Sequence, residues 1–100
     1  MSLMISIHSL EGRISVTIAD KELTNKVIKD KNSKKKINLT SKFYNWKNRK
    51  EEDIKPTIKD AKLILFIGEK AISFGIDNRL IEQKDIQKIE DIPFCHFLKI

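Results

Sequence analysis

The side chains with reactive or metal-binding potential are few in this chain. It has one cysteine and two histidines, and the cysteine and one histidine are adjacent, at Cys95 and His96. A catalytic cysteine needs a base from elsewhere in the fold, and a metal ion needs three or four ligands. Neighbouring residues of a strand point to opposite faces, so this pair cannot converge on one atom. We therefore expect Cys95 in the core, His96 on the surface, and no metal or cofactor.

The remaining candidates for catalysis have simpler explanations. His8 lies in an alternating segment and is interpreted as a partly exposed strand histidine, which approaches His96 only if the terminal strands pair. Glu51, Glu52 and Asp53 are consecutive carboxylates, but consecutive residues splay around a helix instead of converging. Acidic residues at a helix start are favoured by the helix dipole. The sequence therefore favours a protein that is not an enzyme.

One short motif could hold an anion. Gly68-Glu69-Lys70-Ala71 follows an apolar run and opens an expected helix, whose free amides can bind an anion. The lone glycine lacks the spacing of a phosphate loop, and Glu69 would repel an anion. A structural turn is therefore favoured over an anion site at Gly68 and Lys70.

The strongest feature is the distribution of charge. Eleven basic and two acidic residues lie between Lys21 and Lys50, a net charge of +9, while the rest of the chain sums to −3. Lysine and arginine clusters release counterions from phosphates, and aromatic rings stack on unpaired bases. The candidate nucleic-acid-binding residues are Lys34, Lys35, Lys36, Lys42, Tyr44, Trp46, Lys47, Arg49 and Lys50.

Three explanations of this basic segment stay open. It could form an RNA- or ribosome-associated binding module, or bind an acidic protein partner as an adaptor of the translation apparatus. It could also be a solvated lysine-rich surface, with Phe43 and Trp46 capping the core. An enzyme acting on an anionic metabolite ranks below these. Affinity for RNA that falls steeply with salt would favour the first explanation.

A strand over residues 37–44 would place the basic residues in a stripe. Such a strand spans about 25 Å, with basic loops at its two ends and Lys42 between them. A stripe suits a phosphate backbone better than a small metabolite, which needs convergent groups in a concavity. We expect weak, length-dependent RNA binding with little sequence preference.

Hydrophobic periodicity predicts an α+β fold, one mixed sheet with about three short helices. A hairpin turning at Glu11-Gly12 opens the chain, and Asp20 is expected to cap the helix that follows. The hairpin's core candidates are Ile5, Ile7, Ile14, Val16 and Ile18. The predicted strands are 4–9, 13–19, 37–44, 63–67, 86–89 and 94–100, with 63–67 at the buried centre. The predicted helices are 21–29, 51–60 and 69–77, and the predicted loops and last turn are 31–36, 45–49 and 92–93.

A chain of 100 residues is one domain. Residues 1–3 are interpreted as an addition from cloning, which leaves 4–100 as the domain. The sequence contains no run of about 18 apolar residues, so we expect no membrane span. The start does not resemble a signal peptide. With a single cysteine, the expected location is the reducing cytoplasm.

Several strings together resemble an archaeal family catalogued as domain of unknown function 424. The strings are Ala19-Asp20-Lys21-Glu22-Leu23 with Lys26, Leu39 to Tyr44, Ala61 to Ala71 and Ile89 to Pro93. Asn25 and Arg79 stand where the family usually has glycine, so Asn78-Arg79 must supply a left-handed helix cap. Phe94 replaces the family's histidine after the proline. The resemblance implies no assigned reaction.

Overall fold

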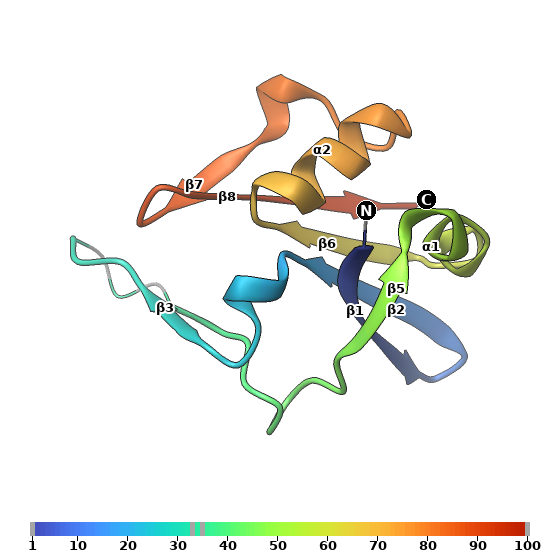
Figure 1. Cartoon of the computed structure of the whole chain (residues 1–100), viewed down its shortest axis with the longest axis horizontal. Coiled ribbons are helices and arrows are strands. Elements are labelled where there is room, and N and C mark those ends of the chain that lie inside the picture. The colour runs from blue at the N-terminus through green and yellow to red at the C-terminus, as the bar shows by residue number, and fades with distance from the viewer. Residues whose placement is uncertain (1, 33, 35, 100) are drawn as a thin grey trace.

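The chain forms a six-stranded mixed sheet, with two α-helices on one side and a two-stranded sheet on the other (Figure 1). The computed structural model describes residues 2–32, 34 and 36–99. The strand order of the large sheet is β5-β1-β2-β6-β8-β7, and β3 pairs with β4 in the small sheet. Strands β2 and β6 run parallel, and the other neighbours run antiparallel. The predicted α+β class is confirmed, and the described residues form two α-helices and two short 3₁₀ helices instead of about three helices.

The strands are β1 (Ser2–Leu10), β2 (Arg13–Ala19), β3 (Val27–Lys29), β4 (Lys36–Asn38), β5 (Lys47–Lys50), β6 (Leu63–Ile67), β7 (Gln87–Ile89) and β8 (Ile92–Leu98). The helices are α1 (Glu51–Ile58) and α2 (Glu69–Asp77), with 3₁₀ helices η1 (Lys21–Leu23) and η2 (Gln83–Asp85). Within the described ranges, no helix is long and apolar enough to cross a membrane.

The first hairpin forms as predicted. Glu11 and Gly12 have φ angles of 53° and 77°, and two left-handed residues suit a two-residue hairpin turn. Of the expected core residues, Ile5 and two on β2 are buried, and Ile14 is half-buried. Ile7 is 50% exposed, so its core assignment is wrong. Because β5 reaches only as far as Ile5, Ile7 has no neighbouring strand on its outer side.

Strand β6 lies in the middle of the sheet, between β2 and β8, as predicted. Ile64 and Phe66 are fully buried beneath the helices. Leu63 and Leu65, which point to the opposite face, are only half-buried. The uninterrupted apolar run therefore does not mean equal burial, because one face of the sheet is covered and the other is partly open.

The predicted helix over 21–29 is wrong. Only η1 forms, and Asn25 then adopts a left-handed φ of 66° that redirects the chain into β3. β3 pairs with β4, and Ile28 is buried against the large sheet. A single helical turn is costly to nucleate, so pairing and burial of β-branched residues outweigh it.

The predicted strand over 37–44 is also wrong. β4 ends at Asn38, and a turn follows in which the amides of Phe43 and Tyr44 donate to the carbonyl of Thr40, at 3.0 and 3.2 Å. The chain then returns as β5, where a loop was expected over 45–49, and pairs with β1. Lys42 therefore lies in a turn rather than on a strand.

The C-terminal half follows the prediction more closely. α1 buries Ile54 and Ile58, and α2 occupies the predicted range. The last turn is formed by Glu90 and Asp91, with φ angles of 50° and 65°, and not by residues 92–93, which belong to β8. Ile89 pairs with Ile92 across this two-residue turn. The two left-handed positions of the turn are therefore occupied by Glu90 and Asp91.

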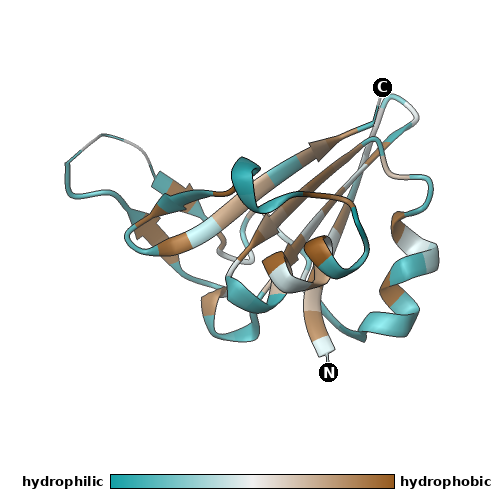
Figure 2. Ribbon diagram, turned by 90° about the horizontal axis from the view of Figure 1, so that it is seen from above, coloured by the Kyte–Doolittle hydropathy of each residue, from teal (hydrophilic) through white to brown (hydrophobic). Residues whose placement is uncertain are grey.

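Alternating strand residues divide the core into two clusters on opposite faces of the large sheet. Figure 2 shows that hydrophobic residues are frequent along the strands of this sheet. Ile18, Phe66 and Cys95 belong to the cluster under α1 and α2. Their neighbours Ala19, Ile67 and Phe94 belong to the second cluster, under the small sheet and Trp46. The second cluster covers only part of its face.

Candidate nucleic-acid interface

The uncovered part of the sheet is formed by residues of four strands that point away from the helices. In one row, His8 pairs with Ser15, Ser15 with Leu63, and Leu63 with Leu98. In the next row, Thr17 pairs with Leu65, and Leu65 pairs with His96. We call this surface, with the residues that border it, the open sheet face.

Two adjoining hollows lie on the open sheet face, with volumes of about 290 and 330 Å³. They share Leu65 and His96, so they adjoin each other, and we call the two hollows together the depression. The first is lined by His8, Ser15, Thr17, Phe43, Tyr44, Leu63, Leu65 and His96, and the second by Lys36, Ile37, Leu65, Gln87, Ile89, Phe94 and His96. Among the described residues, no carboxylate lines either hollow.

An aromatic cluster forms one wall of the depression. Tyr44 stacks on Trp46 with ring centroids 4.9 Å apart, and His8 meets Tyr44 edge-on at 5.4 Å. The indole Nε1 of Trp46 donates to the carbonyl of Leu39 at 2.8 Å. Phe43 is 56% exposed at the rim, with the Lys42 ammonium 5.9 Å from its ring centroid. Trp46 therefore holds Tyr44 in place, and Tyr44 and Phe43 face the depression.

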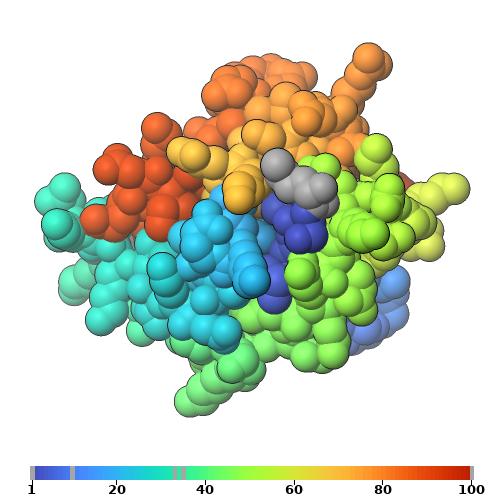
Figure 3. All heavy atoms as spheres, in the orientation of Figure 1, coloured from blue at the N-terminus to red at the C-terminus, as the bar shows by residue number. Residues whose placement is uncertain are grey.

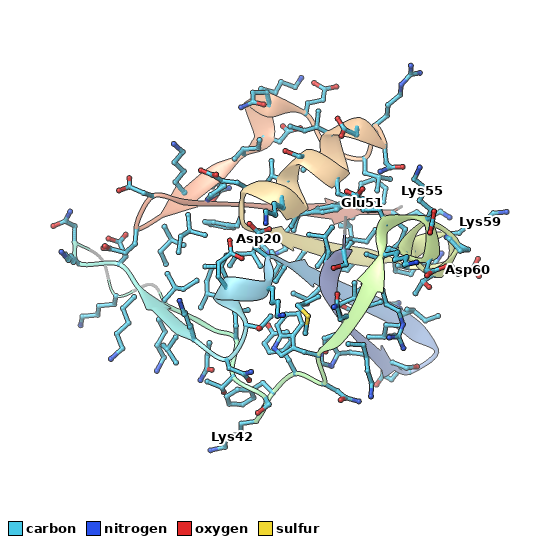
Figure 4. The ribbon with its side chains drawn as sticks, in the orientation of Figure 1. Asp20, Lys42, Glu51, Lys55, Lys59 and Asp60 are labelled. Atoms are coloured by element: carbon cyan, nitrogen blue, oxygen red, sulfur yellow. The ribbon has the colours of Figure 1, made fainter. Side chains whose placement is uncertain are left out.

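The basic candidate residues do not form one straight stripe. Lys36 lines the depression, and Lys42 projects from the turn beside it (Figure 4). On β5, Lys47 pairs with Ile5 and Arg49 with Leu3, so both point toward the helix side. Lys50 points to the opposite side. Lys34 is exposed near β4, and Lys35 lies outside the described residues.

Two of the basic candidates, Lys36 and Lys42, instead frame the open sheet face. Lys36 stands at the end near the small sheet, and Lys42 stands at the aromatic wall. Neither makes an ion pair with a described residue. Residues from about 25 to 50 occupy the side of the molecule away from α2 (Figure 3). The fold therefore gathers uncompensated positive charge around an apolar and aromatic surface.

The amides near Gly68 and Lys70 already hold a carboxyl group. The amides of Lys70 and Ala71 donate to the Asp20 side chain at 3.1 and 2.8 Å. A Cβ at Gly68, whose φ is 105°, would overlap this carboxyl group. Burial raises the pKa of Asp20, while the amide hydrogen bonds oppose that shift. The Asp20 side chain thus caps α2, which begins about fifty residues further along the chain. The sequence had predicted that it would cap a helix directly after it.

Cys95 and His96 lie on opposite faces of β8, as predicted. Cys95 is buried under the helices, and burial raises the pKa of its thiol, with a smaller effect from Asp85. His96 is exposed on the open sheet face. His8 does not approach it, because β2 and β6 separate β1 from β8 and three strand spacings are about 14 Å. In the described part of the chain, no three His, Cys, Asp or Glu side chains could hold a metal.

Sequence reasoning did not identify most of the open sheet face. Ser15 and Thr17 alternate with buried apolar residues along β2, a signal that one face of the strand is less covered. Leu65 gave no such signal, because it lies in an unbroken apolar run. Phe94 and His96 join this surface only through the pairing of β8 with β6.

Comparison with known proteins agrees with the fold and leaves the activity open. The family model described as "Protein of unknown function (DUF424)" matches residues 8–100, so the chain belongs to that family. A similar solved structure is an uncharacterized conserved protein from Methanopyrus kandleri, with a TM-score of 0.77 and 17% sequence identity, over 100% of this chain and 95% of that chain. No curated protein matches the chain. At this identity the likeness establishes the fold alone.

Proposed function

We propose that this member of the DUF424 family binds RNA in the cytoplasm, free or within the ribosome, through the open sheet face and the basic residues that frame it. The observation that supports this most directly is the lining of the depression. It has aromatic, aliphatic and hydroxyl groups and Lys36, and no carboxylate among the described residues. A polyanion therefore meets attraction at the rim and no repulsion at the centre.

The division of charge between the two sides of the molecule points the same way. The segment from Lys21 to Lys50 has a net charge of +9, and it forms the small sheet, the aromatic wall and the edge strand. The segment from Glu51 to Asp85, which contains both α-helices, has eight acidic and six basic residues. A polyanion is therefore attracted to the segment from Lys21 to Lys50 more than to the helices, and within this segment Lys36 and Lys42 stand at the open sheet face while Lys47 and Arg49 point toward the helix side.

The geometry favours binding over catalysis. The strands that carry the two histidines, β1 and β8, lie three strand spacings apart, about 14 Å, and the thiol of Cys95 lies on the other side of the sheet. A nucleophile and its base must lie within hydrogen-bond reach of each other. Contact with RNA, rather than cleavage of it, is what this surface supports.

Paired charge reversals test the proposal. Lys36→Glu with Lys42→Glu changes the frame of the open sheet face, and Lys55→Glu with Lys59→Glu makes the same charge change on α1 and the residue that follows it (Figure 4). Binding of a fluorescent, unstructured RNA is measured by anisotropy between about 50 and 200 mM salt, the range over which phosphate contacts weaken most visibly. Thermal unfolding of each variant checks that the fold is intact.

We expect the Lys36/Lys42 variant to bind more weakly and to lose about 1.4 from its salt slope, because each single-strand phosphate contact contributes about 0.7. The α1 variant should keep a slope close to that of the native protein. Equal losses in both variants would show that net charge alone matters. No RNA binding at low salt would remove the proposal, and a protein partner that survives nuclease would favour the adaptor function instead.

A further inference from the structure

We propose that the open sheet face is a base-stacking platform, selective for unpaired bases of single-stranded RNA over duplex RNA. This inference rests on the proposed RNA binding and specifies the form of RNA. Its basis is that the positive charges stand at the rim, whereas Leu63 and Leu65 form the floor and aromatic rings form one wall. Phosphates fit the rim, and flat apolar bases fit the floor.

Rings line the platform at two places. On β8, where the two hollows adjoin, His96 is exposed and rests edge-on against Phe94, with ring centroids 6.4 Å apart and an interplanar angle of 89°. At the β1 end, Tyr44 is fixed between Trp46 and His8. Rings that are already held in place lose little freedom when a base stacks on them, so they bind bases more favourably than mobile side chains.

The dimensions suit a short run of nucleotides. The depression extends from His8 on β1 to Gln87 on β7, across five neighbouring strands. Four strand spacings amount to about 19 Å. Sheets of four strands with exposed aromatic residues stack two or three bases in a common class of RNA-binding domain, so we expect a similar number here.

The polar groups on the platform favour binding that depends little on the RNA sequence. Ser15 and Gln87 offer a hydroxyl and an amide group that can both donate and accept hydrogen bonds. Every base has a π face, so stacking itself is indifferent to sequence. Bases within a duplex are stacked on each other and cannot present their faces, so duplex RNA can use only the basic rim.

The exposed apolar side chains would also suit a protein partner, but the charges favour RNA. Leu98 is 66% exposed and Phe43 is 56% exposed. A folded protein would have to present acidic groups at two separate rims and an apolar surface between them. Single-stranded RNA has this arrangement in every nucleotide, because a charged backbone alternates with apolar base faces.

Ring removal separates stacking from charge. Phe43→Ala, His96→Ala and the double variant are compared with Ile7→Ala, which removes an exposed apolar side chain on the helix side of β1. His96→Phe restores a ring without the imidazole. Each protein is titrated with a single-stranded 12-mer and with the duplex of the same sequence, at several salt concentrations. Thermal unfolding is measured for every variant.

We expect each ring removal to weaken single-strand binding by about 5- to 150-fold, the range for loss of one stacked base. The salt slope and the affinity for the duplex should stay unchanged. Ile7→Ala should bind like the native protein, and His96→Phe should recover most of the affinity lost in His96→Ala.

The outcomes distinguish the stacking platform from the proposed RNA binding on which it rests. If both ring variants bind single strands normally while the Lys36/Lys42 variant is impaired, the stacking platform is wrong and charge-based RNA binding stands. Equal affinity of the native protein for single-stranded and duplex RNA would also overturn the platform. If the native protein binds neither RNA, both proposals fail together. If the native protein binds a protein ligand but no RNA, and His96→Ala abolishes that binding, the open sheet face would be assigned to a protein partner.

Discussion

The two faces of the central sheet differ in how completely they are covered. On the helix side, Ile64 and Phe66 are sealed beneath α1 and α2, with 1% and 0% of their surfaces exposed. On the other side, the small sheet and Trp46 cover only the end of the sheet near Ala19 and Ile67. Leu63 and Leu65, from the same apolar strand, remain half-buried. Exposed apolar patches on a soluble protein can mark binding surfaces, and the proposed RNA binding assigns this role to the open sheet face.

The largest expected effect comes from one pair of neighbours on β6. Ile64→Ala should destabilise the protein by about 2–5 kcal/mol, because it leaves a cavity in a closed core. Leu65→Ala removes a similar volume from the open sheet face, and it should cost no more than about half as much. Urea unfolding of both variants measures the difference. Equal losses would mean that the open sheet face is as closed in solution as the helix side.

A second substitution tests the contact that joins the ends of β2 and β6. Gly68→Ala should destabilise the protein by about 2–3 kcal/mol, because the new methyl group displaces the Asp20 carboxyl group at a left-handed backbone position. Gly12→Ala is the matched control, since Gly12 is also left-handed but has no atom close to an added Cβ. A similar cost for both would show that backbone strain alone matters and that the approach of Asp20 does not.

The buried carboxyl group should also make stability depend on pH. Burial raises the folded-state pKa of Asp20 above its unfolded value of 3.8, so the folded protein holds this proton more tightly than the unfolded chain. The stabilising contribution of the proton is therefore complete below the unfolded pKa and is lost as pH rises through the folded pKa. The Asp20→Asn variant has no titratable group at this position, so it lacks this pH dependence.

We therefore expect the stability of the native protein, relative to Asp20→Asn, to decline as pH rises from about 3.8 through the acidic range. Chemical unfolding at a series of pH values measures this difference. A difference that grows with pH would mean that the amides of Lys70 and Ala71 stabilise the carboxylate more than burial opposes it.

The smallest expected effect is on the open side. Leu98→Ser should change stability by less than about 0.5 kcal/mol, because Leu98 is 66% exposed. The buried residue across the same strand is Cys95, and Cys95→Ser should cost about 1–3 kcal/mol by placing a hydroxyl in the core. Calorimetric melting of the two variants compares the faces directly. A large loss for Leu98→Ser would indicate that this position is covered in solution.

Prediction from sequence succeeded where a single local signal decided the structure. The alternation of β1 and β2, the Glu11-Gly12 turn and the apolar run of β6 all placed their elements correctly. It failed over 21–50, where polar lysines obscured any periodicity and short elements depend on distant partners. β3 and β5 exist because β4 and β1 pair with them, and propensity alone does not specify such short strands.

For the candidate site, residue type identified several of the residues that lie there, but the sequence did not predict how they are arranged. The basic residues and Tyr44 were identified from charge and ring type, and Lys36, Lys42 and Tyr44 do lie at the open sheet face. Trp46 was identified too, but its indole is engaged with Leu39 and Tyr44. The stripe geometry rested on a straight strand that the turn at Thr40 interrupts.

By itself the sequence determined the class of fold, the central strand, the split of Cys95 and His96, and the concentration of charge, because these follow from local periodicity and composition. Only the tertiary structure decided that Asp20 caps α2 and that His96, Leu65 and Thr17 share one surface. The physical reason is that hydrogen-bond register and helix placement join residues fifty or more positions apart, and no local pattern encodes which face of a sheet remains uncovered.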